Sequence, residues 1–139
     1  MLVVVDTNKL YSCLLSKGNV FKVLSLNSLS KKVEFIAPEF IFFELGKNFD
    51  EILKRSKLSK EELSELFSLI KEQVNTVPFE DFNKFAEQAE KLSPHNKDVQ
   101  YFSLALAFNC GIWSDEKSFR LQPEVEIIST GRLLKFLKK

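Results

Sequence analysis

Short, wholly hydrophobic runs alternate along this chain with longer stretches in which hydrophobic residues recur at helical spacing. The first run, residues 2–5, is aliphatic throughout and stops at Asp6. An unbroken β-branched run is typical of a strand that is covered on both faces, as in a parallel sheet. Comparable runs predict further strands at residues 33–37, 76–77, 112–113 and 124–128.

The segments between these runs predict helices. The clearest helix begins with the capping-box pair Ser59 and Glu62 and continues as an amphipathic stripe to Val74. Spacing or start signals also predict helices at 20–29, after Pro38, around 82–89, from Lys97 until Gly111, and after a cap at Thr130. Strands that alternate with helices favour an α/β fold with a central parallel sheet.

Length and composition set the scale of the fold. At 139 residues and 16.1 kDa, the chain suits one domain, residues 1–139, with a core that needs no disulfides. The residues are 45% hydrophobic, with 14 Phe against only 4 Gly and 4 Pro, which argues against disorder and against a repeat array. We expect a compact, helix-rich domain.

Charge and cysteine usage limit the binding partners and the cellular compartment that we expect. The net charge is +1, so no global basic field argues for nucleic acid, and any polyanion must bind a local patch. Cys13 and Cys110 lie in apolar stretches and have no metal-ligand spacing, which indicates reduced thiols. The first apolar run is too short for a signal peptide, and no run approaches a membrane span. We therefore expect a cytoplasmic protein with no membrane partner.

Acidic residues stand directly after two of the predicted strands. Asp6 follows the first strand, and Asp115 and Glu116 follow Trp113 and Ser114. In parallel α/β sheets, functional groups gather at the carboxyl ends of the strands. We therefore expect these carboxylates to lie near one another.

Two further acids lie on predicted helices. Glu44 comes four residues after Phe40 and beside Phe43, a spacing that predicts a side chain drawn toward the core. Asp98 is in the first turn of its helix on the same side as Phe102, which also predicts an inward side chain.

Each acid has an ordinary explanation when it is taken alone. Asp6 suits a cap or turn, Asp98 suits a helix N-terminus, and Glu44 suits an ion pair with a lysine. Taken together, buried carboxylates repel one another unless a cation neutralises them. Hard oxygen ligands select Mg²⁺ or Mn²⁺, which can activate water for phosphodiester hydrolysis.

The order of these features resembles the PIN-domain family of nucleases over essentially the whole chain. The resemblance rests on the strand before Asp6-Thr7-Asn8, the helix after Pro38 that bears Glu44, and the stretch from Lys97-Asp98 to Trp113-Ser114-Asp115-Glu116 and Phe119. The last stretch is the strongest, and it is most similar to stand-alone archaeal and bacterial members. The resemblance implies a single three-layer α/β/α domain with about five parallel strands.

The resemblance also implies roles for individual residues. Asp6, Glu44 and Asp98 match the first three acidic positions that bind metal and carry catalysis, and Asn8 and Ser114 match polar positions that support the pocket. The fourth position falls on Asp115 or Glu116, because many relatives have Asn and then Asp there. We prefer Asp115, which has the shorter reach from the strand end, and keep Glu116 as a further ligand.

The implied activity is Mg²⁺- or Mn²⁺-dependent cleavage of single-stranded or structured RNA by a metal-activated water. Many small relatives, including VapC-type toxins, belong to toxin-antitoxin pairs, so the resemblance implies an antitoxin partner and a homodimer. Two alternatives remain open. One is a non-catalytic PIN-fold protein that binds nucleic acid or another partner, and the other is a phosphoryl-accepting signalling domain, in which Glu44 would have no role.

Basic residues flank the acids in sequence and are candidates for RNA phosphate contacts, although an ordinary solvated surface explains each equally well. They are Lys9, Lys17, Lys47, Lys97, Lys117 and Arg120. His95 is the only histidine and precedes Asp98, but a metal site needs no histidine base. The exposed face of the helix that contains Leu63 is a candidate contact for a second copy or an antitoxin.

Overall fold

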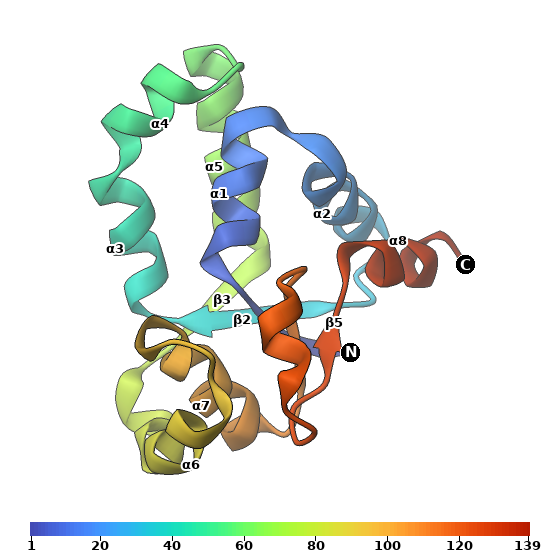
Figure 1. The fold of residues 1–139 in the computed structure, drawn as a ribbon. Helices are drawn as coiled ribbons and strands as arrows, with labels where there is room; N and C mark the ends of the chain where they lie inside the picture. Colours follow the sequence, from blue (N-terminus) through green and yellow to red (C-terminus); the bar gives the residue numbers. More distant parts are fainter.

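A computed structural model describes residues 1–139 and contains one five-stranded, all-parallel sheet (Figure 1). The strands lie in the order β3-β2-β1-β4-β5. Their bounds are β1 Leu2–Val5, β2 Glu34–Pro38, β3 Val74–Val77, β4 Gly111–Trp113 and β5 Ile127–Ile128. The predicted α/β class and parallel sheet are therefore confirmed.

Helices cover both faces of this sheet. Their bounds are α1 Thr7–Ser16, α2 Gly18–Ser30, α3 Phe40–Lys47, α4 Phe49–Arg55, α5 Lys60–Gln73, α6 Ala86–Leu92, α7 Val99–Phe108 and α8 Thr130–Lys138, with short 3₁₀ turns η1 Phe79–Asp81, η2 Asn83–Phe85, η3 Asn96–Asp98 and η4 Lys117–Leu121. In Figure 1, α1, α2, α5 and α8 lie on one side of the sheet, and α6 and α7 lie on the other. The molecule is therefore a three-layer α/β/α domain.

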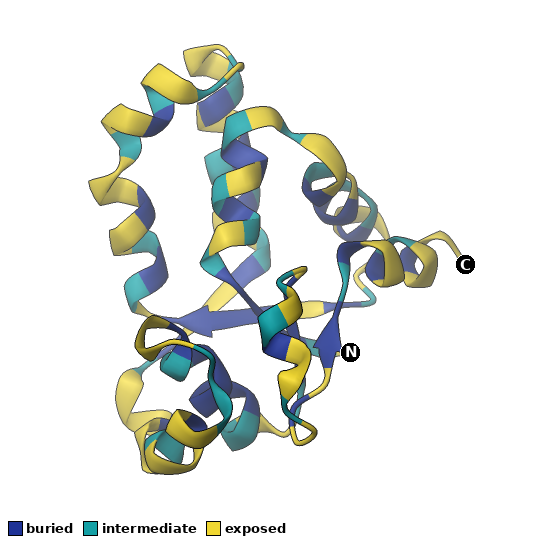
Figure 2. Ribbon diagram, viewed as in Figure 1, coloured by how far each residue is buried: buried dark blue, intermediate teal, exposed yellow.

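Alternation along the central strand divides the core between the two layers. Val3 and Val5 belong to the cluster that includes residues of α1, α2, α5 and α8, whereas Val4 belongs to the cluster that includes residues of α6 and α7. All three are fully buried, and Figure 2 shows most of the visible sheet in the dark blue of buried residues. This is the reason that the first strand reads as a continuous aliphatic run.

Several predicted boundaries differ from those of the structure. Val74 starts β3 instead of continuing α5, and Pro38 ends β2 instead of opening α3. The predicted strand at 124–128 is reduced to Ile127–Ile128. The predicted helix at 82–89 begins as the turn η2 and becomes α-helical only in α6.

Two helix ends are set by residues other than those predicted. Ser129, not Thr130, caps α8, because its side chain accepts a hydrogen bond from the Arg132 amide. Asn109, at φ 51°, terminates α7, whereas Gly111 already belongs to β4. Gly111 is needed there for another reason, since a Cβ would lie 2.9 Å from the backbone oxygen of Glu126 on the neighbouring chain segment.

None of the helices combines the length and apolar character that a membrane crossing requires.

Candidate metal centre

Asp6 lies at the end of β1 and is the N-cap of α1. Its carboxylate accepts hydrogen bonds from the Asn8 amide at 3.1 Å and from the Ser114 hydroxyl at 3.2 Å, and the residue is only 2% exposed. Burial raises the pKa of Asp6 to about 6, and the negative charges of Glu116 and Asp98 act in the same direction, against the two hydrogen bonds. Asp6 thus lies directly after the first strand, as the sequence predicted.

Asp98 closes the turn η3 directly before α7 and is 3% exposed, as its spacing predicted. Its Oδ2 atom is buried and has no hydrogen-bond partner. Burial is the main cause that raises its pKa, and the Glu116 charge adds to it, while Lys97 and His95 oppose the rise. A buried carboxylate oxygen without a partner is rare in folded proteins and calls for an explanation.

Asp6 and Asp98 line the same cleft, which has a volume of about 510 Å³. The other residues that line it are Thr7, Asn8, Phe40, Glu44, Asn96, Lys97, Gln100 and Tyr101. The cleft thus joins the start of α1, one face of α3, and the start of α7. Two of the predicted acids, Asp6 and Asp98, are buried where they line it, and a third, Glu44, is exposed on α3.

Glu44 is exposed, which corrects the prediction of a core-facing side chain. The buried stripe of α3 runs through Ile41 and Leu45, so Phe40 and Glu44 lie one position away and line the cleft. Phe43 is 72% exposed and does not share the core side either. Glu44 takes part in none of the ion pairs, so its charge is not satisfied by a lysine.

The extended chain after β4 sends alternate side chains in opposite directions. The Ser114 hydroxyl donates a hydrogen bond to Asp6, and the Glu116 carboxylate accepts one from the side-chain amide of Asn8 at 2.8 Å. The Glu116 backbone N–H also donates to the Ser114 hydroxyl at 3.2 Å. These residues belong to the acidic site, and Glu116 raises the pKa of both Asp6 and Asp98.

Asp115 faces a different set of partners. It accepts hydrogen bonds from the Thr130 backbone at 2.9 Å, from the Thr130 hydroxyl at 2.5 Å, and from Lys9 at 2.5 Å. Burial alone would raise its pKa, but Lys9 and Thr130 together hold the pKa of Asp115 below its usual value. The structure therefore brings Glu116, and not Asp115, to the other acids.

The donor set suits a hard divalent cation, although the side chains do not converge on one point. No group of three His, Cys, Asp or Glu side chains is arranged closely enough to hold an ion. Carboxylate oxygens are nevertheless the ligands that Mg²⁺ and Mn²⁺ prefer, and a cation would satisfy the unpaired Asp98 oxygen. Glu44 is exposed and Glu116 half-buried, so both side chains have room to turn toward it.

The cleft includes residues that the sequence did not single out. Tyr101 is buried, and its hydroxyl is hydrogen-bonded to both the backbone N–H and the hydroxyl of Thr7. Burial raises the pKa of Tyr101 to about 12, so it remains a neutral phenol. Its position three residues after Asp98, on the same helix face, was the available signal. Tyr101 thereby ties α7 to the start of α1.

The candidate basic contacts separate by position. Lys97 lines the cleft, whereas Lys9 is paired with Asp115 and Lys17 with Glu62 at 3.1 Å. Lys47, Lys117 and Arg120 are exposed. Of the six, Lys97 alone lines the acidic cleft.

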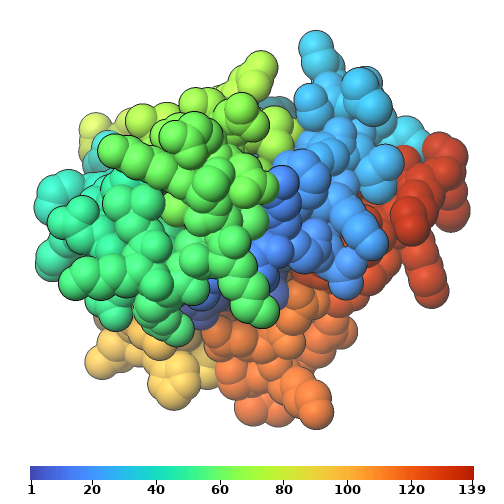
Figure 3. Space-filling model, turned by 90° about the horizontal axis from the view of Figure 1, so that it is seen from above, coloured from blue at the N-terminus to red at the C-terminus, as the bar shows by residue number.

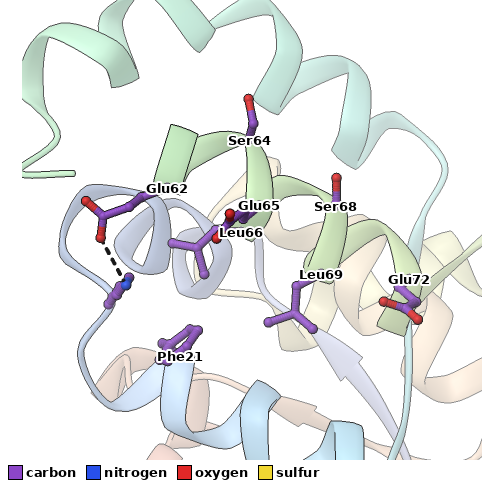
Figure 4. Close-up of a pocket in the computed structure, with 9 residues that line it drawn as sticks. Phe21, Glu62, Ser64, Glu65, Leu66, Ser68, Leu69 and Glu72 are labelled. Carbon is purple, nitrogen blue, oxygen red and sulfur yellow. Dashed lines mark ion pairs between the residues drawn. The ribbon is translucent and has the colours of Figure 1, made fainter. Parts of the chain in front are cut away.

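A second hollow, of about 540 Å³, lies between α2 and α5 and shares no lining residue with the cleft of Asp6 and Asp98. Figure 3 looks onto this layer, with α1 and α2 in blue beside α5 in green. Figure 4 shows Phe21, Leu66 and Leu69 toward the hollow, with Glu62, Glu65 and Glu72 also among its lining residues. Its floor is thus apolar, and its rim carries three Glu side chains, of which Glu62 is paired with Lys17.

A parallel α/β/α domain with an acidic cleft at the ends of its central strands defines a narrow class of protein. The family model described as the PIN domain matches residues 4–129, so the chain belongs to the PIN-domain family, whose members are nucleases. This assignment excludes the phosphoryl-accepting signalling domain as a reading of the fold.

Among solved structures, the chain is similar to one in the crystal structure of VapBC2 from Rickettsia felis bound to a DNA fragment from their promoter. The two chains are 17% identical, with a TM-score of 0.60, over 93% of this chain and 98% of the other. At this identity the likeness shows the fold. No curated protein matches the sequence.

Proposed function

We propose that this protein is a Mg²⁺- or Mn²⁺-dependent ribonuclease whose metal ligands are Asp6, Glu44, Asp98 and Glu116. The observation that carries the proposal is the buried Oδ2 of Asp98, which has no hydrogen-bond partner, in a cleft that is also lined by the buried carboxylate of Asp6. Leaving such a group unsatisfied costs about 1–3 kcal/mol, and more when it is charged. A bound cation would remove that cost.

Glu116 takes the fourth ligand position in this proposal. Its carboxylate is held by Asn8, and its charge raises the pKa of both buried aspartates. Asp115, the other candidate, is committed to Thr130 and Lys9.

When bound, the ion would activate a water molecule and stabilise negative charge on the phosphate. The chain's own residues prepare the geometry. Ser114 and Asn8 orient Asp6 and Glu116, and Tyr101 holds Thr7 at the edge of the cleft. Lys97 forms none of the ion pairs and lines the cleft, so its ammonium group is available to a phosphate oxygen.

Cleavage of labelled single-stranded RNA in Mn²⁺ tests the proposal, with double-stranded RNA and single-stranded DNA as comparison substrates. We expect wild type to cleave RNA and Asp98→Asn, purified in parallel, to be inactive. Equal activity of the two proteins would assign the cleavage to a contaminant. RNA binding without cleavage would favour the non-catalytic alternative.

We further infer an antitoxin partner that binds the hollow between α2 and α5. The similar Rickettsia felis structure is of a complex, VapBC2, with DNA. The apolar floor and the carboxylates of Glu65 and Glu72, which take part in none of the ion pairs, suit a basic amphipathic segment. Homodimer formation stays a prediction from the resemblance.

A further inference from the structure

Asp115 joins three elements of the fold beside the proposed metal centre. Its side chain receives Lys9 from α1 and both the backbone and hydroxyl groups of Thr130 from the start of α8. The Thr130 hydroxyl in turn accepts a hydrogen bond from the buried Trp113 indole at 2.9 Å. We refer to Trp113, Thr130, Asp115 and Lys9 as the clamp.

The clamp and the acidic site share one short segment of chain. Because side chains alternate along extended backbone, residues 113 and 115 face α8 while residues 114 and 116 face Asp6 and Asn8. Two neighbouring residues of α1, Asn8 and Lys9, hold the same segment through Glu116 and Asp115. The segment after β4 is thus fixed to α1 at two points.

From this geometry we propose that Asp115 is a positioning residue, not a metal ligand: the clamp sets the orientation in which Ser114 and Glu116 meet the acidic cleft. This inference rests on the proposed function for its effect on cleavage, but its structural content does not. Lys9 is then also part of the clamp and not an RNA contact, since its side chain is only 15% exposed and its ammonium group lies against Asp115.

The test compares Asp115→Asn and Lys9→Met, which open the clamp from its two ends, with Glu116→Gln. Ser129→Ala is the matched control, because it removes the cap of the same helix without touching the clamp. Three quantities are measured for each: Mn²⁺ affinity, kcat for RNA cleavage, and the NMR resonance of the Asn8 side-chain amide. That resonance reports the hydrogen bond to Glu116 in the metal-free protein.

We expect Asp115→Asn and Lys9→Met to weaken Mn²⁺ binding by less than Glu116→Gln does, to lose about tenfold or more in kcat, and to shift the Asn8 resonance. Glu116→Gln should weaken Mn²⁺ binding by more than about tenfold. Ser129→Ala should change none of the three quantities. Lys9→Met keeps the test valid if Asp115→Asn fails to fold.

Two results would overturn the inference. Loss of Mn²⁺ binding in Asp115→Asn equal to that in Glu116→Gln would make Asp115 a ligand. An Asn8 resonance that stays unchanged in both clamp variants, as in Ser129→Ala, would show that the clamp does not orient the site. Because the resonance needs neither metal nor cleavage, it shows whether the clamp orients the site even if the protein proves to be no nuclease.

Discussion

Asp6 occupies a position in which its charged form is disfavoured. The side chain is almost completely buried, and its pKa is raised to about 6 from 3.8. Glu116 and Asp98 contribute to the rise, so the metal-free cleft holds mutually repelling carboxylates. Such strain is typical of a site that is arranged for a cation and not for the stability of the empty fold.

This raised pKa makes the stability of the metal-free protein depend on pH. Since the folded pKa exceeds the unfolded one, the folded state binds more protons between pH 4 and 6, and the Asp6 contribution to stability falls as pH rises through that range. The loss approaches about 3 kcal/mol above pH 6. Asp6→Asn should not lose this stability, because an Asn side chain does not ionise.

The check is urea unfolding of both proteins in EDTA at pH 4 and at pH 7. We expect Asp6→Asn to be the more stable protein at pH 7 and to lose this advantage toward pH 4. An advantage that does not change with pH would mean that Asp6 ionises normally in the fold.

The residues of the site were predictable to different extents. Asp6 and Asp98 were placed correctly because a strand end and a helix face fix them locally. The choice between Asp115 and Glu116 was not local, since it depends on Thr130, fifteen residues further along the chain. Glu44 was placed on the wrong side because spacing defines a helix face but not which face meets the core.

At the scale of elements, α5 illustrates how far local signals determine structure. The predicted capping box is present, with Ser59 accepting from the Glu62 amide at 3.1 Å and Glu62 accepting from the Ser59 amide at 3.1 Å. The end of the helix was harder to place, because Val74 fits the stripe yet pairs with Phe35 in the sheet. Short elements such as β5 depend on partners distant in sequence and have little pattern of their own.

Removal of the cap should destabilise α5 measurably. We expect Ser59→Ala to lower the free energy of unfolding by about 1 kcal/mol, because the Glu62 amide loses its acceptor. Ser64→Ala, at an exposed position inside the same helix, is the control and should be neutral or slightly stabilising. Equal effects of the two substitutions in urea unfolding would argue against the cap.

At the scale of the whole molecule, the two hollows lie in different places and suit different partners. The acidic cleft opens among α1, α3 and α7, whereas the hollow between α2 and α5 lies on the helical layer seen in Figure 3. A net charge of +1 supplies no general attraction for RNA, so binding must depend on local groups such as Lys97. The hollow between α2 and α5, with Glu65 and Glu72 on its rim, instead favours a basic protein segment.

Partner binding at the hollow between α2 and α5 can be tested with the product of any small gene that lies beside the gene for this chain. If the two proteins copurify, the double variant Glu65→Lys and Glu72→Lys should weaken their association at least about tenfold, because it reverses charge on the rim. Glu87→Lys with Glu90→Lys makes the same charge change on α6, across the sheet, and should have little effect. An equal loss of association in both double variants would show that the hollow has no specific role in partner binding.

The most direct test of the metal centre is a calorimetric titration of Mn²⁺ into wild type and Asp98→Asn at pH 6. We expect wild type to bind Mn²⁺ and to release protons, because the pKa of Asp6 is about 6 and a bound cation would ionise it. Asp98→Asn should bind at least about tenfold more weakly. Equal binding by the two proteins, or no binding by either, would contradict the assignment of these buried acids to a metal site.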